Sequence, residues 1–228
     1  MIKRHSFAVF AACAFWMTAG AAGALEGFRI DQSKQALAPE VMASLNAQLD
    51  VVASAGLPPQ VLDAMKGTTI VVDPDLRGNP GMFAVRDGIG AVYVRPIVFA
   101  SNRPILLHEL LHAYHFKVLG MKRPEIQQEY QRVKNANLFP ARFQGAHFLE
   151  NHKEFFAVTA TLYLFGDIQQ PPFSCAALSK LDAAYLAFLG AQFGPNKCPA
   201  LAQRGEQNEP VRPSAQIGPI NTADGALR

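Results

Sequence analysis

The sequence predicts an α+β fold, with a small mixed sheet that includes a hairpin, a helix packed on it and further C-terminal helices. Two observations predict this class. Segments rich in β-branched residues are confined to the region between residues 68 and 99, and segments with helical spacing of apolar residues lie before and after it. Helices and strands are thus segregated along the chain rather than alternating, which favours α+β over a doubly wound sheet.

The part before residue 100 is predicted to hold two helices, a strand and a hairpin. Apolar residues at helical spacing indicate a helix within residues 39–56, and Pro59 begins a shorter one that ends near Met65. The β-branched run at 68–73 indicates a strand. The Asp87-Gly88 pair lies between two apolar segments and predicts the turn of a β-hairpin.

The part after residue 100 is predicted to be mainly helical, because its apolar residues recur at helical spacing between glycine and proline breaks. The expected elements are a helix from Pro104 to about Gly120, a helix over 124–137, an aromatic loop over 138–148, a helix over 151–164 and a last helix over 179–191.

The first 24 residues have the composition of a secretory signal peptide. Lys3 and Arg4 precede an apolar run of mostly small residues that ends at Ala24. The alternative is a membrane anchor, but the apolar core is shorter than the roughly 20 residues that a span requires. We therefore expect cleavage near Ala24, a periplasmic or secreted protein, and no stable membrane anchor after cleavage.

Removal of residues 1–24 leaves one domain over 25–202 and a polar, flexible tail over 203–228, which is poor in large apolar residues. The segment removed carries two of the positive charges, so the formal net charge falls from +3 to +1. No basic patch remains that would attract phosphates, and we expect no nucleic-acid partner.

The expected export of the protein also predicts a disulfide bond. Cys13 leaves with the signal peptide, and only Cys175 and Cys198 remain. Two cysteines in an oxidising compartment are expected to pair. The alternatives are two buried free thiols or a cysteine-bound zinc, and the absence of a CxxC spacing disfavours the latter.

The segment HELLH, from His108 to His112, is the strongest candidate for a metal site. Residues four apart lie on one face of a helix, so both imidazoles can reach one ion, and Glu109 lies beside them. A zinc ion with this pair, a third protein ligand and a water would be a catalytic site in which Glu109 serves as the general base. His115 does not fit the next position of a HExxHxxGxxH motif, where glycine is required, and we expect it to be packed or to support a ligand.

Glu154, in the segment ENHKEFFA, is the expected third ligand. The neighbouring apolar residues predict a buried helix, in which a carboxylate requires a partner. Glu150 and His152 are the alternative ligands. A purely structural role for Glu154 also exists, because Asn151 followed three residues later by an acid is typical of a helix N-terminus.

HELLH followed by NHKEFFA resembles the catalytic domain of anthrax toxin lethal factor and its relatives among the gluzincin metallopeptidases. The resemblance covers the two motifs and the order of elements, over roughly residues 40–193. It implies a zincin-like domain in which His108, His112 and Glu154 bind Zn²⁺ and Glu109 is the base.

One residue departs from the pattern of this family, which has a tyrosine upstream of the ligand glutamate to stabilise the oxyanion. The matching position here is His147, whose imidazole can donate a similar hydrogen bond or can simply pack in the aromatic loop. Tyr114 and Tyr163 are expected to face away from the site.

The sequence therefore predicts an exported zinc metallopeptidase that acts on a peptide or protein substrate. The substrate would pair with a free edge of the strand at 91–94, unless that strand is internal. Two alternatives share the metal site: a zinc-binding interaction protein of the cell envelope without catalysis, and a zinc amidase that acts on cell-wall components.

Overall fold

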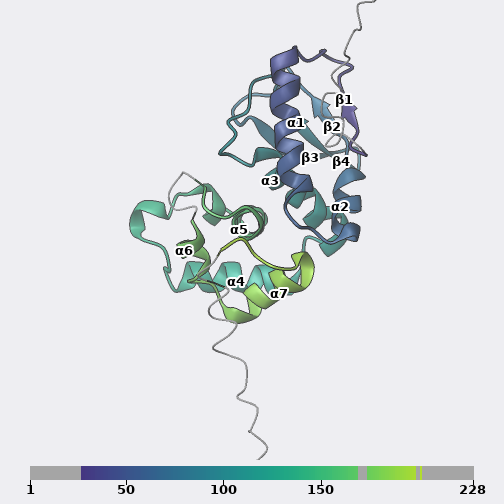
Figure 1. Ribbon diagram of the computed structural model, residues 1–228. Coiled ribbons are helices and arrows are strands. Elements are labelled where there is room, and N and C mark those ends of the chain that lie inside the picture. The colour runs from purple at the N-terminus through teal and green to yellow at the C-terminus, as the bar shows by residue number, and fades with distance from the viewer. Residues whose placement is uncertain (1–26, 169–173, 199–200, 202–228) are drawn as a thin grey trace, which may run out of the picture.

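The structure is a computed structural model, which describes residues 27–168, 174–198 and 201. It is a mixed α+β fold with one four-stranded sheet and several helices, as Figure 1 shows, so the predicted class is confirmed. The predicted signal peptide over 1–24 and the predicted tail over 203–228 lie outside the described residues.

The N-terminal part contains the sheet and its covering helices, in the upper half of Figure 1. Its elements are β1 (Ile30–Asp31), α1 (Pro39–Ala53), α2 (Pro59–Lys66), β2 (Ile70–Val72), β3 (Gly81–Arg86) and β4 (Ile89–Val94). Prolines at the first turns of α1 and α2 fit helix starts, where the missing N–H has no intrahelical partner. The two helices, the strand and the hairpin expected from the sequence are confirmed, and only the two-residue β1 was not predicted.

The sheet has the strand order β1-β2-β4-β3. β1, β2 and β4 are parallel, and β3 is antiparallel to β4. The expectation of a free edge at 91–94 is therefore wrong, because β4 pairs with β2 on one side and with β3 on the other. Its residues are buried on both faces from Gly90 onward, as a central strand requires. The free edge of the sheet on the side of the hairpin is β3, which pairs only with β4.

The hairpin turn has the backbone conformation that its sequence predicts. Asp87 and Gly88 both have positive φ values, 51° and 77°, and Arg86 pairs with Ile89 across the turn. A two-residue turn of this kind matches the right-handed twist of the strands, and aspartate and glycine tolerate the left-handed conformation. The turn thereby fixes the register that aligns Met82 with Tyr93.

The helix that carries the HELLH segment is α3 (Ile105–Tyr114). It continues into a π-helical segment, η1 (His115–Leu119), which ends at Gly120 with a φ of 82°. The sequence predicted one regular helix to Gly120. The wider turn of η1 was not foreseen, because apolar periodicity does not distinguish an α-helix from one π-helical turn.

The C-terminal part is helical and occupies the lower half of Figure 1. Its elements are α4 (Pro124–Asn135), the 3₁₀ turns η2 (Ala141–Phe143) and η3 (His147–Leu149), α5 (His152–Phe165), α6 (Cys175–Leu178) and α7 (Ala183–Phe193). The predicted last helix over 179–191 is wrong at its start, because Asp182 caps α7 by accepting a hydrogen bond from the N–H of Ala184.

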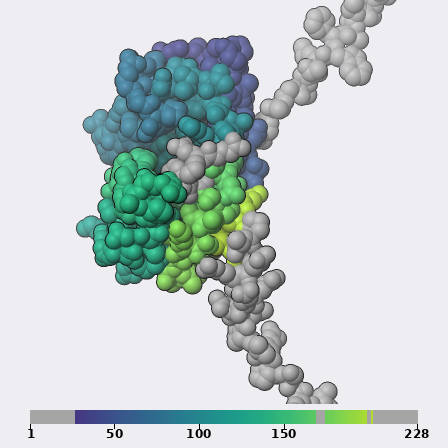
Figure 2. Space-filling model, turned by 90° about the vertical axis from the view of Figure 1, so that its left-hand side faces the viewer, coloured from purple at the N-terminus to yellow at the C-terminus, as the bar shows by residue number. Residues whose placement is uncertain are grey.

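The two parts share one apolar core, and α3 lies at its centre. α3 contacts α1, β3 and β4 on one side and α5 on the other. Leu107, Leu110 and Leu111 on this helix are fully buried. Figure 2 shows the two parts packed against each other, the N-terminal part in purple to blue and the C-terminal part mainly in green. Side chains on α3 therefore reach residues of both parts.

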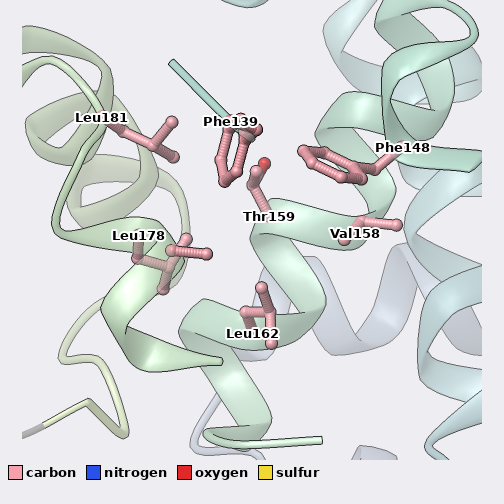
Figure 3. A pocket seen from close by; sticks show the side chains of 8 residues that line it. Phe139, Phe148, Val158, Thr159, Leu162, Leu178 and Leu181 are labelled. Carbon is pink, nitrogen blue, oxygen red and sulfur yellow. The ribbon is translucent and has the colours of Figure 1, made fainter. Parts of the chain in front are cut away.

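A disulfide links Cys175 at the start of α6 to Cys198 after α7, which confirms the predicted pair. Nearby, a small pocket is lined by apolar side chains of α5, α6 and the aromatic loop, among them Phe148, Leu162 and Leu178 (Figure 3). Its volume is about 10 Å³, room for about one water molecule. Because it holds no charged side chain, we regard it as a packing defect rather than a ligand site.

No helix among the described residues is long and apolar enough to cross a membrane.

Candidate metal centre

α3 places His108 and His112 on one face, one turn apart. Their Nε2 atoms are 3.2 Å apart and their ring planes are nearly perpendicular, at 89°. Their side chains are 18% and 10% exposed, respectively, so both rings are largely shielded while the Nε2 atoms converge on one point. The leucines on the other faces of α3 fix the helix in the core and so hold the two rings in place.

α5 supplies the third group of the cluster. Oε2 of Glu154 lies 3.1 Å from Nε2 of His112 and 3.5 Å from Nε2 of His108. Asn151 caps α5, since its Oδ1 accepts from the N–H groups of Lys153 and Glu154. The cap role expected for this region thus belongs to Asn151, whereas the Glu154 side chain is turned toward the histidines.

The spacing of the three groups fits one metal ion. Ligand atoms about 2.0–2.1 Å from an ion at tetrahedral angles lie about 3.3–3.4 Å from one another. The three separations here are 3.1, 3.2 and 3.5 Å. Two imidazoles and a carboxylate are also donors that suit Zn²⁺. His108, His112 and Glu154 could therefore hold a metal ion.

The negative charge of Glu154 is stabilised in this arrangement. Burial alone would raise the pKa of its carboxyl group, but hydrogen bonds from His108 and His112 and the charge of the nearby His147 outweigh burial. The net effect holds the pKa well below the usual range of a glutamate. A carboxylate that stays ionised is the form that a metal ion requires of a ligand.

The two alternative ligands lie elsewhere. Oε2 of Glu150 is 3.1 Å from Nδ1 of His147, and Nε2 of His152 lies 3.0 Å from the carbonyl oxygen of Met121. His115 is fully buried against Phe156, with the two ring centroids 4.8 Å apart. None of these three residues belongs to the cluster of ligand atoms.

Glu109 lies beside the cluster and contacts the edge strand of the sheet. Its side chain is almost fully buried, and its Oε2 accepts a hydrogen bond of 2.7 Å from the N–H of Phe83 on β3. Burial raises the pKa of Glu109, although the charge of His108 and the bond from Phe83 act in the opposite direction. A raised pKa makes its carboxylate a better proton acceptor.

β3 can approach Glu109 because it begins with a glycine. A Cβ atom at Gly81 would lie 2.9 Å from Cγ2 of Ile105 and 3.1 Å from Cγ of Glu109. A side chain at this position would therefore require the side chains of Ile105 and Glu109 to shift. The role of β3 in holding Glu109 was missed by the sequence analysis, since nothing in the spacing of Gly81 or Phe83 indicates which helix contacts the strand.

His147 extends from η3 toward the cluster. Its Nε2 lies 2.9 Å from Oε2 of Glu154, and its side chain is 46% exposed. Burial lowers the pKa of His147, but hydrogen bonding to Glu150 and the charges of Glu154 and Glu150 reverse this effect and leave the pKa raised. His147 therefore lies at the rim of the site, beside Glu154, and not only packed among the aromatic side chains of its loop.

The two tyrosines considered in the sequence analysis point away from the cluster. Tyr114 donates to Oε1 of Gln192, and Tyr163 donates to the carbonyl oxygen of Gly194. Both partners belong to α7 or its C-terminal cap. No tyrosine of the described residues lines the hollows at the cluster, so His147 stands there as the hydrogen-bond donor from this loop.

The cluster lies in a cleft that extends to both sides of it. Toward the C-terminal end of α3 a hollow of about 510 Å³ is lined by His112, Glu154 and Phe116 among others. Toward the N-terminal end of α3 a second hollow of about 390 Å³ is lined by Arg103 and Ile105 among others. Both volumes are within the range of ligand pockets, about 300–1,000 Å³.

Comparison with known proteins gives no match: no protein family, no curated protein and no solved structure resembles the chain significantly.

Proposed function

We propose that the protein is an exported, zinc-dependent metallopeptidase. The observation that carries the proposal is the convergence of Nε2 of His108, Nε2 of His112 and Oε2 of Glu154 at separations that suit one tetrahedral ion. The buried Glu109 beside this cluster favours catalysis over a purely structural metal site, because a structural zinc has no use for a base.

Each residue has a defined part in this proposal. His108, His112 and Glu154 would hold the ion, which when bound supplies a Lewis acid and lowers the pKa of a coordinated water to about 7. Glu109 would accept the proton of the attacking water and pass it to the leaving amine, and Phe83 positions the carboxylate for this role through its N–H. His147 would donate a hydrogen bond to the developing oxyanion.

The zincin-like character of the domain is part of the same proposal. Its support is the resemblance of HELLH and NHKEFFA to the lethal factor family, together with the order of a hairpin, the HELLH-bearing helix and a later glutamate-bearing helix. The proposed export and cleavage near Ala24 are supported by the composition of the N-terminal segment. The disulfide is in keeping with an oxidising compartment.

The substitution Glu109→Gln tests the proposal. The amide keeps the size of the side chain but cannot accept a proton, so we expect turnover of a random peptide mixture to fall about 10²- to 10⁴-fold while zinc content stays unchanged. The measurement is mass spectrometry of the cleaved peptides beside metal analysis of the same samples. Glu40→Gln is the matched control, since Glu40 is exposed at the start of α1 and lines neither hollow at the cluster.

Two results would separate this proposal from its alternatives. If the zinc-loaded wild type leaves every peptide intact but cleaves amide bonds in cell-wall fragments, the substrate class is that of an amidase. If neither is cleaved and zinc binds nonetheless, the protein is a zinc-binding module of the envelope.

A further inference from the structure

The side chains that line the cleft on the two sides of the metal cluster point to the class of substrate. We propose that the cleft binds an extended peptide segment with a large apolar side chain on one side of the cluster and an acidic group on the other. The inference rests on the proposed peptidase function for its substrate class and adds the two positions that determine specificity.

The extended shape follows from the free edge of β3. The carbonyl oxygen of Pro80 accepts from the N–H of Arg95, whereas the N–H of Phe83 turns away from β4 and donates to Glu109. Alternate residues of a strand direct their backbone groups to the same side. The backbone N–H and C=O groups of Val85 therefore also point away from β4. The C=O of Phe83 and the backbone groups of Val85 can therefore pair with an extended peptide beside the cluster.

The hollow toward the C-terminal end of α3 has an apolar wall, made by Phe83 and Val85 of β3 together with Phe116 and Met121. The exposed Lys153 also lines this hollow. The rings of Phe83 and Phe116 pack together with centroids 5.8 Å apart. Val85 is 42% exposed, an apolar side chain left in water at the mouth of this hollow. A large apolar side chain of the peptide would cover this surface.

The hollow toward the N-terminal end of α3 contains a permanent cation. Arg103 is the sole arginine or lysine among the residues described as lining it, and its side chain is exposed. Within the described part of the chain, no acidic side chain forms an ion pair with Arg103. A carboxylate of the peptide could therefore pair with the guanidinium in bidentate geometry.

The experiment uses the full chain loaded with zinc and a random peptide library, in two formats. The wild type reports cleavage, and the Glu109→Gln variant reports binding without turnover. We expect both formats to select an apolar residue on one side of the cleaved or bound position and Asp or Glu on the other. Arg103→Glu should reverse the preference between acidic and basic residues by at least about tenfold. Arg29→Glu, an exposed charge next to β1 at the opposite edge of the sheet, should leave it unchanged.

The apolar position has its own variants. Phe116→Ala should reduce the selection for large apolar residues about tenfold or more, and Val85→Lys should do the same without removing a packed ring. Val118→Ala is the control, since Val118 is exposed and lies on the same π-helical segment but does not line the hollow. Zinc content measured for every variant shows that the cluster is intact.

The outcomes separate the two proposals. If the wild type cleaves peptides without this pattern, or if Arg103→Glu behaves as Arg29→Glu does, the specificity inference is wrong and the peptidase function stands. If Glu109→Gln binds peptides with the pattern but the wild type cleaves none, the inference stands and the peptidase function is wrong. Absence of both binding and cleavage overturns the inference.

Discussion

The two parts of the molecule contribute to the candidate metal centre in different ways. The N-terminal part, taken together with α3, supplies His108, Glu109 and His112 from five consecutive residues of one helix, and its sheet edge positions the base. The C-terminal part supplies Glu154 and His147 from a helix and a loop more than 30 residues further along the chain. The first contribution is a local property of helix periodicity, whereas the second depends on how α5 packs on α3.

The position of Glu154 is therefore easier to disturb than the positions of the two histidines. α3 is anchored by leucines that are fully buried between the sheet and α5, so its two imidazoles keep their spacing as long as the core is folded. Glu154 lies in the first turn of α5, and its position depends on the Asn151 cap and on the packing of the C-terminal helices. Changes in the C-terminal part are therefore expected to affect the third ligand before they affect the histidines.

The largest effect is expected from removal of a ligand on either side. His112→Ala and Glu154→Ala should each lower zinc affinity by more than about 100-fold, the upper limit for the loss of an outer-sphere partner. Competition with a coloured chelator measures the affinity. Equal losses would show that the two parts contribute equally to one ion, and an unchanged affinity in Glu154→Ala would remove the C-terminal part from the site.

The next effect concerns the disulfide, which belongs to the C-terminal part alone. Cys175 and Cys198 are 23 residues apart, and closing a loop of this length stabilises the folded chain by about 3 kcal/mol. Replacing both cysteines with alanine should lower the free energy of unfolding by about that amount in urea denaturation. Zinc binding at low temperature, where the chain stays folded, should persist. If zinc binding is lost while the chain is folded, the disulfide is needed to position Glu154.

An acid-induced loss of stability is expected from His115, which lies between the two parts. Burial, followed by the charges of His152, His112 and Lys153, lowers the pKa of His115 from 6.5 to about 4. A histidine with a lowered pKa stabilises the fold fully above pH 6.5, and this contribution is lost as the pH falls toward 4 because the unfolded chain takes up the proton first. The loss amounts to about 2–3 kcal/mol.

The metal-free chain and its His115→Leu variant provide the comparison for this prediction. The wild type should lose about 2–3 kcal/mol more unfolding free energy than His115→Leu between pH 6.5 and pH 4, as measured by urea denaturation at each pH. Parallel pH profiles would show that His115 is not held neutral in the core.

The smallest effect separates helix capping from ligand positioning. Asn151→Ala and Asp182→Ala each remove an N-cap, from α5 and α7 respectively, and each should cost about 1 kcal/mol of unfolding free energy. Only Asn151→Ala should also weaken zinc binding, because only α5 carries Glu154. The same affinity in both variants would show that the cap has no influence on the ligand.

The sequence could predict the features of the site that depend on neighbouring residues in the chain. Helical spacing indicated that His108 and His112 share a face, and the Asp87-Gly88 turn fixed the hairpin, because both are local properties of the chain. Glu154 was expected from the buried helix around it, and His147 from a resemblance of motifs. The structure places Glu154 at the histidines and His147 beside Glu154.

Other features could not be predicted because they depend on contacts between distant residues. The sequence did not reveal that β4 is internal and β3 is the free edge, since the order of strands depends on how β2 enters the sheet. The contact of Glu109 with Phe83 and the exposed Arg103 at one end of the cleft also result from tertiary packing. These contacts, and not the HELLH segment alone, determine which side chains line the cleft.

The most direct test of the central claim is X-ray absorption at the zinc edge of the metal-loaded full chain, combined with zinc analysis. We expect one zinc per chain, bound by two imidazoles and by oxygen donors, with one imidazole lost in His112→Ala. A chain that retains no zinc after purification and reloading would contradict this expectation. So would a spectrum with three imidazoles, which would assign His147 rather than Glu154 to the ion.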